Sequence, residues 1–302
     1  MITNPNTNKF SPNLRIAAQS TCTLGENPLW HADEQRLYWC DIVHGRLFRH
    51  DPQSGITEMV RDGAADRSMI GGFTFEADGA LLLFMNGGRI ERWSGAASET
   101  IREADPDMQD TRFNDVIADP LGRVFCGTMS TPTRPGKLYL LDIDQSMKPV
   151  VENVGCSNGM AFSPGQGLLY YTDSVARTIT RFEYEANSGA IRSPKIFTSI
   201  PPDVGLPDGL TIDAEGYLWS ARWDGGVIVR YAPSGEEVHR IVVPAPKPTS
   251  LAFGGRELRT LFITTAGGDT PLTEGALAGS LFAFEPGMCG VPEFRSRICS
   301  NL

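Results

Sequence analysis

The sequence predicts an all-β fold, a six-bladed β-propeller with four-stranded blades. Three features lead to this prediction: one kind of short apolar segment recurs six times, its copies are almost evenly spaced, and turns rich in Gly, Asp and Pro separate them. The chain has 302 residues, of which 41% are hydrophobic, 32 are Gly and 21 are Pro. This composition allows a large core and indicates frequent turns rather than long helices.

The six recurring segments are rich in aromatic and β-branched residues, which favour strands. They span residues 36–42, 80–86, 123–129, 168–174, 217–223 and 260–266, and they align on Tyr38, Leu82, Phe125, Tyr170, Trp219 and Phe262. The intervals between the aligned residues are 44, 43, 45, 49 and 43. A period of this length fits one four-stranded sheet per repeat, which is the unit of a β-propeller.

A second predicted strand follows the first in most repeats. These segments are 45–51, 88–94, 136–144, 177–185, 226–235 and 279–287. Six such repeats nearly use up the chain, so we expect residues 14–302 to form one propeller domain and residues 1–13 to form a flexible tail. We expect a strand near residues 14–22 to close the ring by pairing with the C-terminal end. A solenoid or a double sandwich with accidental spacing is the alternative.

The composition also excludes several classes of protein. The formal net charge is −9 and no basic block offsets it, which argues against a nucleic-acid partner. Neither a signal peptide nor an apolar run long enough for a membrane span is visible. The six cysteines are scattered without CxxC or zinc-knuckle spacing, a pattern typical of reduced thiols. We therefore expect a cytoplasmic protein that is a monomer or a small homo-oligomer.

One polar position recurs at a fixed distance before the aligned strands. It lies 11 or 12 residues before the aligned residue, and four repeats place an oxygen-bearing side chain there: Glu26, Asn114, Asn158 and Asp208. The other two repeats have Gly71 or Gly72, and Thr249 or Ser250, at this place. Because equivalent positions near the axis of a propeller surround its central channel, these four distant side chains can converge.

Carboxylate and amide oxygens without His or Cys suit a hard divalent cation such as Ca²⁺, Mg²⁺ or Mn²⁺. Zn²⁺ is also compatible if carboxylates bind it. We therefore expect one divalent metal cation as the cofactor. Each residue alone has a simpler interpretation. Residues 207–209 read as a turn that enters a strand, Asn158-Gly159 is an equally common turn pair, and Glu26 could be an exposed loop carboxylate.

Five segments of the chain resemble the senescence marker protein/gluconolactonase/luciferin-regenerating enzyme family, which includes regucalcin and bacterial sugar lactonases. The segments are LGENPLWH, RFNDVIADPLGRVFCGTM, SNGMAFSPGQGLLYYTDS, LPDGLTIDAEGYLWSARWDGG and FGGRELRTLFIT. They occur in the family's order and cover roughly residues 18 to 285. The resemblance implies a six-bladed propeller with one divalent metal in the channel, and an enzyme that hydrolyses a sugar (aldono) lactone to the aldonic acid in carbohydrate catabolism.

By position, the family's metal ligands correspond to Glu26, Asn158 and Asp208. The resemblance also implies that Asp208 acts as the catalytic general base and that Arg112 and Asn114 bind the substrate. Arg112 could instead form an ordinary surface or inter-blade salt bridge. The chain departs from the family at two places. It has Gly25-Glu26-Asn27-Pro28 where the family usually has Gly-Glu-Gly-Pro, and Ser130, Thr131 and Pro132 follow Met129 where regucalcin-type members have acidic residues.

Lactone hydrolysis requires an activated water and a means of holding negative charge on the carbonyl oxygen. A divalent cation would act as the Lewis acid. The sequence does not decide whether Asp208 or the cation activates the water. Two other classes remain open: another metal-assisted hydrolase that acts on phosphotriesters or larger lactones, and a non-catalytic calcium-binding propeller. No Gly-x-Ser-x-Gly motif is present, which argues against a serine esterase.

Overall fold

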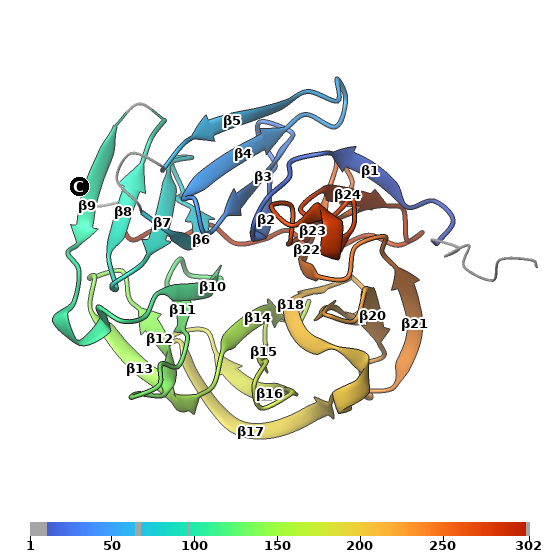
Figure 1. Ribbon diagram of the computed structural model, residues 1–302. Coiled ribbons are helices and arrows are strands. Elements are labelled where there is room, and N and C mark those ends of the chain that lie inside the picture. The colour runs from blue at the N-terminus through green and yellow to red at the C-terminus, as the bar shows by residue number, and fades with distance from the viewer. Residues whose placement is uncertain (1–10, 64–67, 96, 300–302) are drawn as a thin grey trace, which may run out of the picture.

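The computed structural model describes residues 11–63, 68–95 and 97–299. Its strands form six four-stranded antiparallel sheets arranged in a ring around a central axis (Figure 1). The predicted six-bladed β-propeller is thereby confirmed, and the solenoid and double-sandwich alternatives are wrong. Residues 1–10 of the expected tail lie outside the described residues, so the division into a tail (1–13) and one domain (14–302) stays a prediction.

Each blade runs from an innermost strand to an outermost one. Blades 1 to 3 contain β2 (Gly25–His31), β3 (Arg36–Asp41), β4 (Arg46–His50) and β5 (Thr57–Arg61); β6 (Ile70–Phe75), β7 (Leu81–Met85), β8 (Ile90–Trp93) and β9 (Ser98–Arg102); and β10 (Phe113–Ala118), β11 (Val124–Thr128), β12 (Gly136–Leu141) and β13 (Met147–Val154). Blades 4 and 5 contain β14 (Ser157–Phe162), β15 (Leu168–Asp173), β16 (Thr178–Glu185) and β17 (Ala190–Ser199); and β18 (Leu206–Ile212), β19 (Leu218–Trp223), β20 (Val227–Tyr231) and β21 (Glu237–Val242). Blade 6 contains β22 (Pro248–Gly254), β23 (Thr260–Thr265), β24 (Leu281–Phe284) and β1 (Arg15–Ala18).

The described residues also contain three short helical turns, each of which lies between strands: η1 (Pro106–Met108), η2 (Pro202–Val204) and α1 (Pro271–Glu274). The six recurring segments of the sequence are the second strands of the blades, and the six aligned residues are all buried. Burial decreases from the axis outward. In blade 4, every residue of the innermost strand β14 is buried, whereas no residue of the outermost strand β17 is fully buried.

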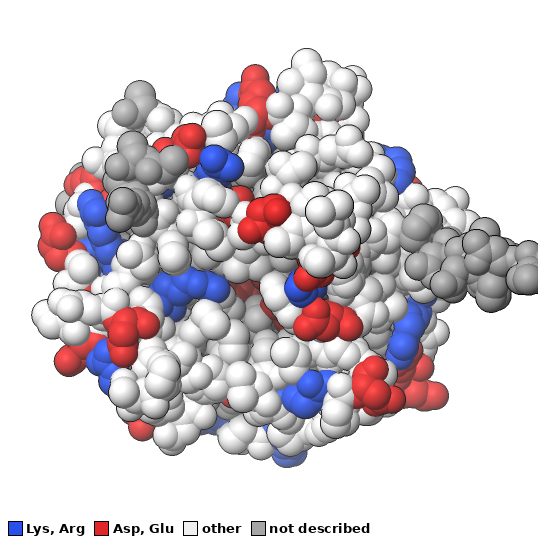
Figure 2. Space-filling model, viewed as in Figure 1, with Lys and Arg blue, Asp and Glu red and all other residues white. Residues whose placement is uncertain are grey.

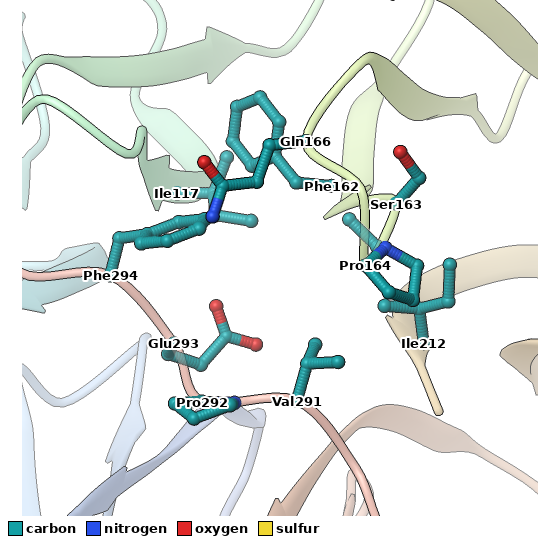
Figure 3. A pocket seen from close by; sticks show the side chains of 11 residues that line it. Ile117, Phe162, Ser163, Pro164, Gln166, Ile212, Val291, Pro292, Glu293 and Phe294 are labelled. Atoms are coloured by element: carbon teal, nitrogen blue, oxygen red, sulfur yellow. The ribbon is translucent and has the colours of Figure 1, made fainter. Parts of the chain in front are cut away.

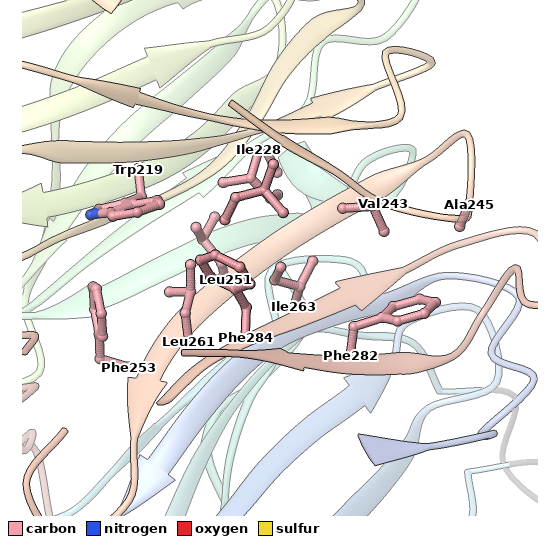
Figure 4. Close-up of a cluster of buried hydrophobic side chains, with 12 residues drawn as sticks. Trp219, Ile228, Val243, Ala245, Leu251, Phe253, Leu261, Ile263, Phe282 and Phe284 are labelled. Carbon is pink, nitrogen blue, oxygen red and sulfur yellow. The ribbon is translucent and has the colours of Figure 1, made fainter. Parts of the chain in front are cut away.

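The ring closes as expected, because β1 pairs antiparallel with β24 and thus completes blade 6 from both ends of the chain. Neighbouring blades are held together by apolar side chains packed between their faces. Figure 4 shows the cluster between blades 5 and 6, which includes Trp219, Ile228, Leu261 and Phe282. Because each such side chain contributes about 1.5–3 kcal/mol when fully buried, these inter-blade layers are the main source of stability.

Carboxylates fix the turns that lead from the innermost strand to the second strand. The Asp119 carboxylate accepts hydrogen bonds from the backbone N–H groups of Leu121 and Arg123. Asp213, at the same place in blade 5, accepts from Glu215 and Tyr217. The Asp of each turn therefore replaces ladder hydrogen bonds that the chain loses as it reverses.

The segment after β24, residues 286–299, crosses one face of the ring and is called the C-terminal strap. It runs behind the blades in the view of Figure 1. Gly290 bridges to Asp213 of blade 5, and the carboxylate of Glu76 in blade 2 accepts hydrogen bonds from the backbone of Ile298 and Cys299. The strap thus joins blades that are not neighbours in sequence.

The strap and the far ends of inner strands enclose a cavity of about 260 Å³. Figure 3 shows the Glu293 carboxylate in this cavity, among the apolar side chains of Phe162, Ile212, Val291 and Phe294. We call it the strap cavity. Among the described residues, no helix has the length and apolar character that crossing a membrane would require. All six cysteines are free thiols.

Candidate active site

The recurring polar position lies near the start of the innermost strand in every blade. At this place the pairing with the second strand shifts register in all six blades, between Glu26 and Leu29 in blade 1 and between Pro207 and Leu210 in blade 5, for example. Such a bulge redirects side chains relative to a regular strand. The turn that the sequence suggested at residues 207–209 is therefore wrong, because these residues belong to β18 and carry its bulge.

Close packing of adjacent blades explains the glycine that follows Asn158 and Asp208. A Cβ atom on Gly159 would lie 2.4 Å from the backbone nitrogen of Leu210 in the next blade. A Cβ on Gly209 would lie 2.3 Å from the hydroxyl of Ser250. The Asn-Gly and Asp-Gly pairs are therefore required by the approach of one innermost strand to the next, and they are not turn pairs here.

The structure brings the five predicted site residues to one cavity of about 330 Å³ near the axis. Glu26, Arg112, Asn114, Asn158 and Asp208 all line it. Figure 2 shows a hollow at the centre of this face with acidic atoms inside it. Glu26 is only 7% exposed, so the alternative of an exposed loop carboxylate is wrong.

The two carboxylates of this site are destabilised by their surroundings. Burial, together with the nearby charges of Asp208 and Asp115, raises the pKa of Glu26 well above its usual range. Burial also raises the pKa of Asp208, and the charge of Asp115 adds to this effect. Asp115 itself has a pKa raised to about 6 by burial. A positive charge bound among these groups would be strongly favoured, because it would stabilise their ionised forms.

The amide of Asn158 is held with its oxygen uncommitted. Its Nδ2 donates to the Ser174 hydroxyl at 3.1 Å, and that hydroxyl donates to the carbonyl of Pro207 at 2.6 Å. The buried Oδ1 of Asn158 has no hydrogen-bond partner within the described part of the chain. An unpaired buried oxygen costs about 1–3 kcal/mol, so a ligand for it is expected.

The donor set of two carboxylates and one amide oxygen fits a hard divalent cation. The described residues contain no group of three or more His, Cys, Asp or Glu side chains suited to a metal. This finding agrees with a set in which Asn158 supplies the third protein oxygen and solvent or substrate supplies the others. A site of this kind has open positions, as a catalytic metal requires.

Arg112 is fixed by its neighbour in blade 3. Its Nη1 donates to the Phe113 carbonyl at 2.9 Å and to Oδ1 of Asn114 at 2.6 Å. Nδ2 of Asn114 donates to the Ser157 carbonyl of blade 4 at 2.8 Å. Within the described residues Arg112 forms no ion pair, so it is not an ordinary salt-bridge residue, and its Nε and Nη2 groups are available to a ligand.

Two aspartates that could have been site residues serve the backbone instead. Asp41 accepts hydrogen bonds from the backbone of Thr23 and Leu24, just before Glu26. Asp173 does the same for Gly155 and Cys156, just before Asn158. Both therefore hold the chain that leads into a site strand.

Asn27 explains the departure from Gly-Glu-Gly-Pro. Its φ of +50° lies in the left-handed region, which Gly adopts freely and Asn tolerates better than most residues. Its Oδ1 accepts a hydrogen bond from the backbone of Phe73 in blade 2 at 2.8 Å. Compared with the Gly that is usual in the family, Asn27 adopts this backbone conformation less freely, but it adds a hydrogen bond between blades 1 and 2.

Apart from Arg112, sequence reasoning missed a second tier of residues that line the cavity. Leu24, Arg112, Cys156 and Leu206 each lie two residues before a ring residue, and all four have strand-like pairing. Side chains two apart in a strand point to the same side, so this tier could have been found by counting back from the ring. The rim is completed by Met129 directly after β11, Val175 just after β15 and Trp223 at the end of β19.

A six-bladed propeller with carboxylate and amide oxygens converging on a cavity at one end of its axis belongs to the class of propellers that have a ligand site in the central channel. Within that class, the chain belongs to the SMP-30/gluconolactonase/LRE-like family, whose model matches residues 24–267. The resemblance inferred from the motifs is therefore confirmed.

Individual relatives match over most of their length. Pentonolactonase XacC of Haloferax volcanii is 45% identical over 92% of this chain and 96% of its own. The 6-deoxy-6-sulfogluconolactonase of Pseudomonas putida is 31% identical over 93% of this chain and 97% of its own. Among solved structures, a luciferin-regenerating enzyme superposes with a TM-score of 0.85 at 27% identity, covering 94% of this chain and 99% of that one.

Proposed function

We propose that this chain is a metal-dependent sugar lactonase that hydrolyses an aldonolactone to the aldonic acid in carbohydrate catabolism. The named lactonases among its relatives indicate a lactone-hydrolysing enzyme, that is, a carboxylic ester hydrolase. The observation that carries the metal dependence is the convergence of Glu26, Asp208 and the unpaired Oδ1 of Asn158 on one cavity.

Glu26, Asn158 and Asp208 would hold one divalent cation. When bound, this cation supplies Lewis acidity toward the lactone carbonyl and stabilises the two ionised carboxylates. Ca²⁺, Mg²⁺, Mn²⁺ and carboxylate-bound Zn²⁺ all agree with an all-oxygen donor set.

Asp208 acts as the general base. Its carboxylate accepts a proton from the attacking water while the water oxygen forms a bond to the carbonyl carbon. The bond between that carbon and the ring oxygen then breaks, and the proton passes to the ring oxygen, which becomes the hydroxyl of the acid. Asp208 suits this role because it is buried, which keeps competing water away from the transferred proton.

Arg112 positions the substrate. Its free Nε and Nη2 donors face the cavity and can bind a lactone hydroxyl or the carboxylate that forms. Asn114 holds Arg112 through Oδ1, and its Nδ2 donates to the Ser157 carbonyl at 2.8 Å and to the Cys156 sulfur at 3.8 Å. The weak bond to sulfur is the one that a substrate hydroxyl would replace. A purely calcium-binding propeller would not need, beside its ion, a half-buried arginine that forms no ion pair with the described residues.

The test is proton release in a pH-stat from a panel of aldonolactones, with each divalent cation added to EDTA-stripped protein. Asp208→Asn and Glu26→Gln should lose at least 100-fold in kcat/KM, whereas the exposed control Asp203→Asn should keep its activity. Thermal unfolding gives a second readout, because the cation should stabilise the unmodified protein but not Glu26→Gln. Full turnover by the stripped protein would disprove metal dependence, and exclusive hydrolysis of phosphotriesters or aryl esters would disprove the substrate class.

A further inference from the structure

The cavity that holds the proposed metal ligands has two unlike sides. On the side of blade 3, Arg112 and Asn114 present hydrogen-bonding groups. The other side is formed by blades 1 and 5, whose upper-tier residues are Leu24 and Leu206, with Trp223 beside them. The positions two residues before the ring residues therefore offer hydrogen bonds to one edge of a ligand and apolar contacts to the opposite edge.

The rim above this tier extends the apolar side. Val175, just after β15 of blade 4, lines the cavity next to blade 5 and is 64% exposed, so a ligand would cover it on binding. Met129 lies on the other side, directly after β11 of blade 3. Apolar side chains that stay exposed at the mouth of a site contribute binding energy when a carbon-rich surface covers them. The same contacts would remove water from a hydroxyl without replacing its hydrogen bonds.

We call the apolar side of the cavity, formed by Leu24, Val175, Leu206 and Trp223, the apolar wall. The Trp223 ring is held in place in this wall. The ammonium of Lys247 lies 5.3 Å from its ring centroid, a cation–π geometry. The same ammonium pairs with Glu274 and, at 3.9 Å, with Asp224. Lys247 is thus neutralised, and the rim has no other cation among the described residues that line the cavity except Arg112 on the opposite side.

We propose that the site selects aldonolactones whose terminal carbon is a methyl group, that is, terminal-deoxy sugar lactones, over those with a terminal hydroxyl or a terminal anionic group. This inference depends on the proposed lactonase function and adds the substrate class to it. The hydroxyls near the carbonyl face Arg112 and Asn114, and the terminal carbon lies against Leu206, Trp223 and Val175. Discrimination comes from the hydroxyl that would be buried there without a partner.

The experiment compares stereochemically matched lactones in two series: L-galactonolactone and its 6-deoxy analogue, and L-mannonolactone and its 6-deoxy analogue. In the series that is hydrolysed, kcat/KM should be about 10- to 100-fold higher for the 6-deoxy compound. A 6-sulfonated aldonolactone should be the poorest substrate of the panel. Most of the difference should appear in KM, because the terminal carbon is remote from the reacting carbonyl.

Two variants test the assignment of the wall. Val175→Asn changes an exposed rim residue and leaves the core intact, and Leu206→Asn places an amide deeper in the wall. Each should reduce the preference for the deoxy lactone at least threefold. The matched control Ile196→Asn, exposed on the outer strand of blade 4, should leave the preference unchanged.

The outcomes separate this inference from the proposed function. Equal or better hydrolysis of the hydroxylated partner in both series would overturn the terminal-deoxy preference while the lactonase assignment stands. An unchanged preference in both wall variants would also overturn it. If no lactone is hydrolysed with any cation, the lactonase function fails and this inference fails with it.

Discussion

Replacing Glu293 by Gln should make the protein more stable at high pH and leave it unchanged at low pH. The Glu293 carboxylate lies in the strap cavity among apolar side chains (Figure 3). Burial and the charge of Asp115 raise the pKa of Glu293 from 4.5 to about 7. The folded state therefore holds this proton more tightly than the unfolded state, and stability is lost as pH rises from about 4.5 through about 7.

The size of the stability difference follows from the shift in the pKa of Glu293. Each pKa unit corresponds to 1.36 kcal/mol, so the shift sets an upper limit of about 3 kcal/mol at pH 8. Because Glu293 is only half-buried, solvent screens its charge, and we expect a stability difference of about 1–2 kcal/mol.

Urea unfolding in EDTA at pH 4.5 and pH 8 measures this difference for the unmodified protein and for Glu293→Gln. The exposed Glu236→Gln serves as the control for loss of one negative charge. The unmodified protein and Glu293→Gln should have equal stability at pH 4.5, and Glu293→Gln should be more stable than the unmodified protein at pH 8. A difference that does not change with pH, or a variant that is less stable at pH 8, would refute the reasoning.

Three further substitutions test the inner strands. Asn27→Ala should cost about 1–2 kcal/mol in urea unfolding, because it keeps the strained backbone and loses the bond to blade 2, whereas Asn27→Gly should cost less than 1 kcal/mol; equal losses would contradict this account. Gly159→Ala should cost more than 2 kcal/mol, since its new Cβ meets the backbone of Leu210; near-native stability would show that the blades can move apart. Ser174→Ala frees the Asn158 amide to rotate, so it should weaken the affinity for the activating cation about 10-fold, measured by calorimetry. It should also cost about 1–3 kcal/mol of stability in EDTA, because the Pro207 carbonyl loses its donor. An unchanged affinity would show that Ser174 does not orient the amide.

The propeller could be predicted because its repeat is visible in residues that the fold must bury. Tyr38 and Trp219 stand at equivalent places in blades far apart in sequence, and both are core residues. The ring residues could be predicted for the same reason, since Glu26 and Asp208 share a register with the blades. A repeat fixes which residues are equivalent, and equivalence is enough to bring them to one axis.

The bulge could not be predicted, because Asn-Gly and Asp-Gly are the usual residues of turns. Only the distance from Gly159 to the next strand shows why glycine is required there. The rim was also missed, because Val175 lies in the turn after β15, and because the position of the Trp223 side chain at the end of β19 depends on contacts such as that with Lys247. Contacts of this kind join residues that no repeat relates.

The C-terminal strap determines how molecules pass through the ring. Phe294 packs edge-on against Phe162 with ring centroids 5.9 Å apart, and Val291 packs against the apolar cluster between blades 4 and 5. These side chains lie at the ends of the inner strands that are away from Glu26 and Asp208. We therefore expect substrate and product to pass through the mouth beside Glu26 and Asp208, so that each product leaves by the route along which the next substrate arrives. A molecule bound between Val175 and Trp223 would therefore block both substrate entry and product release.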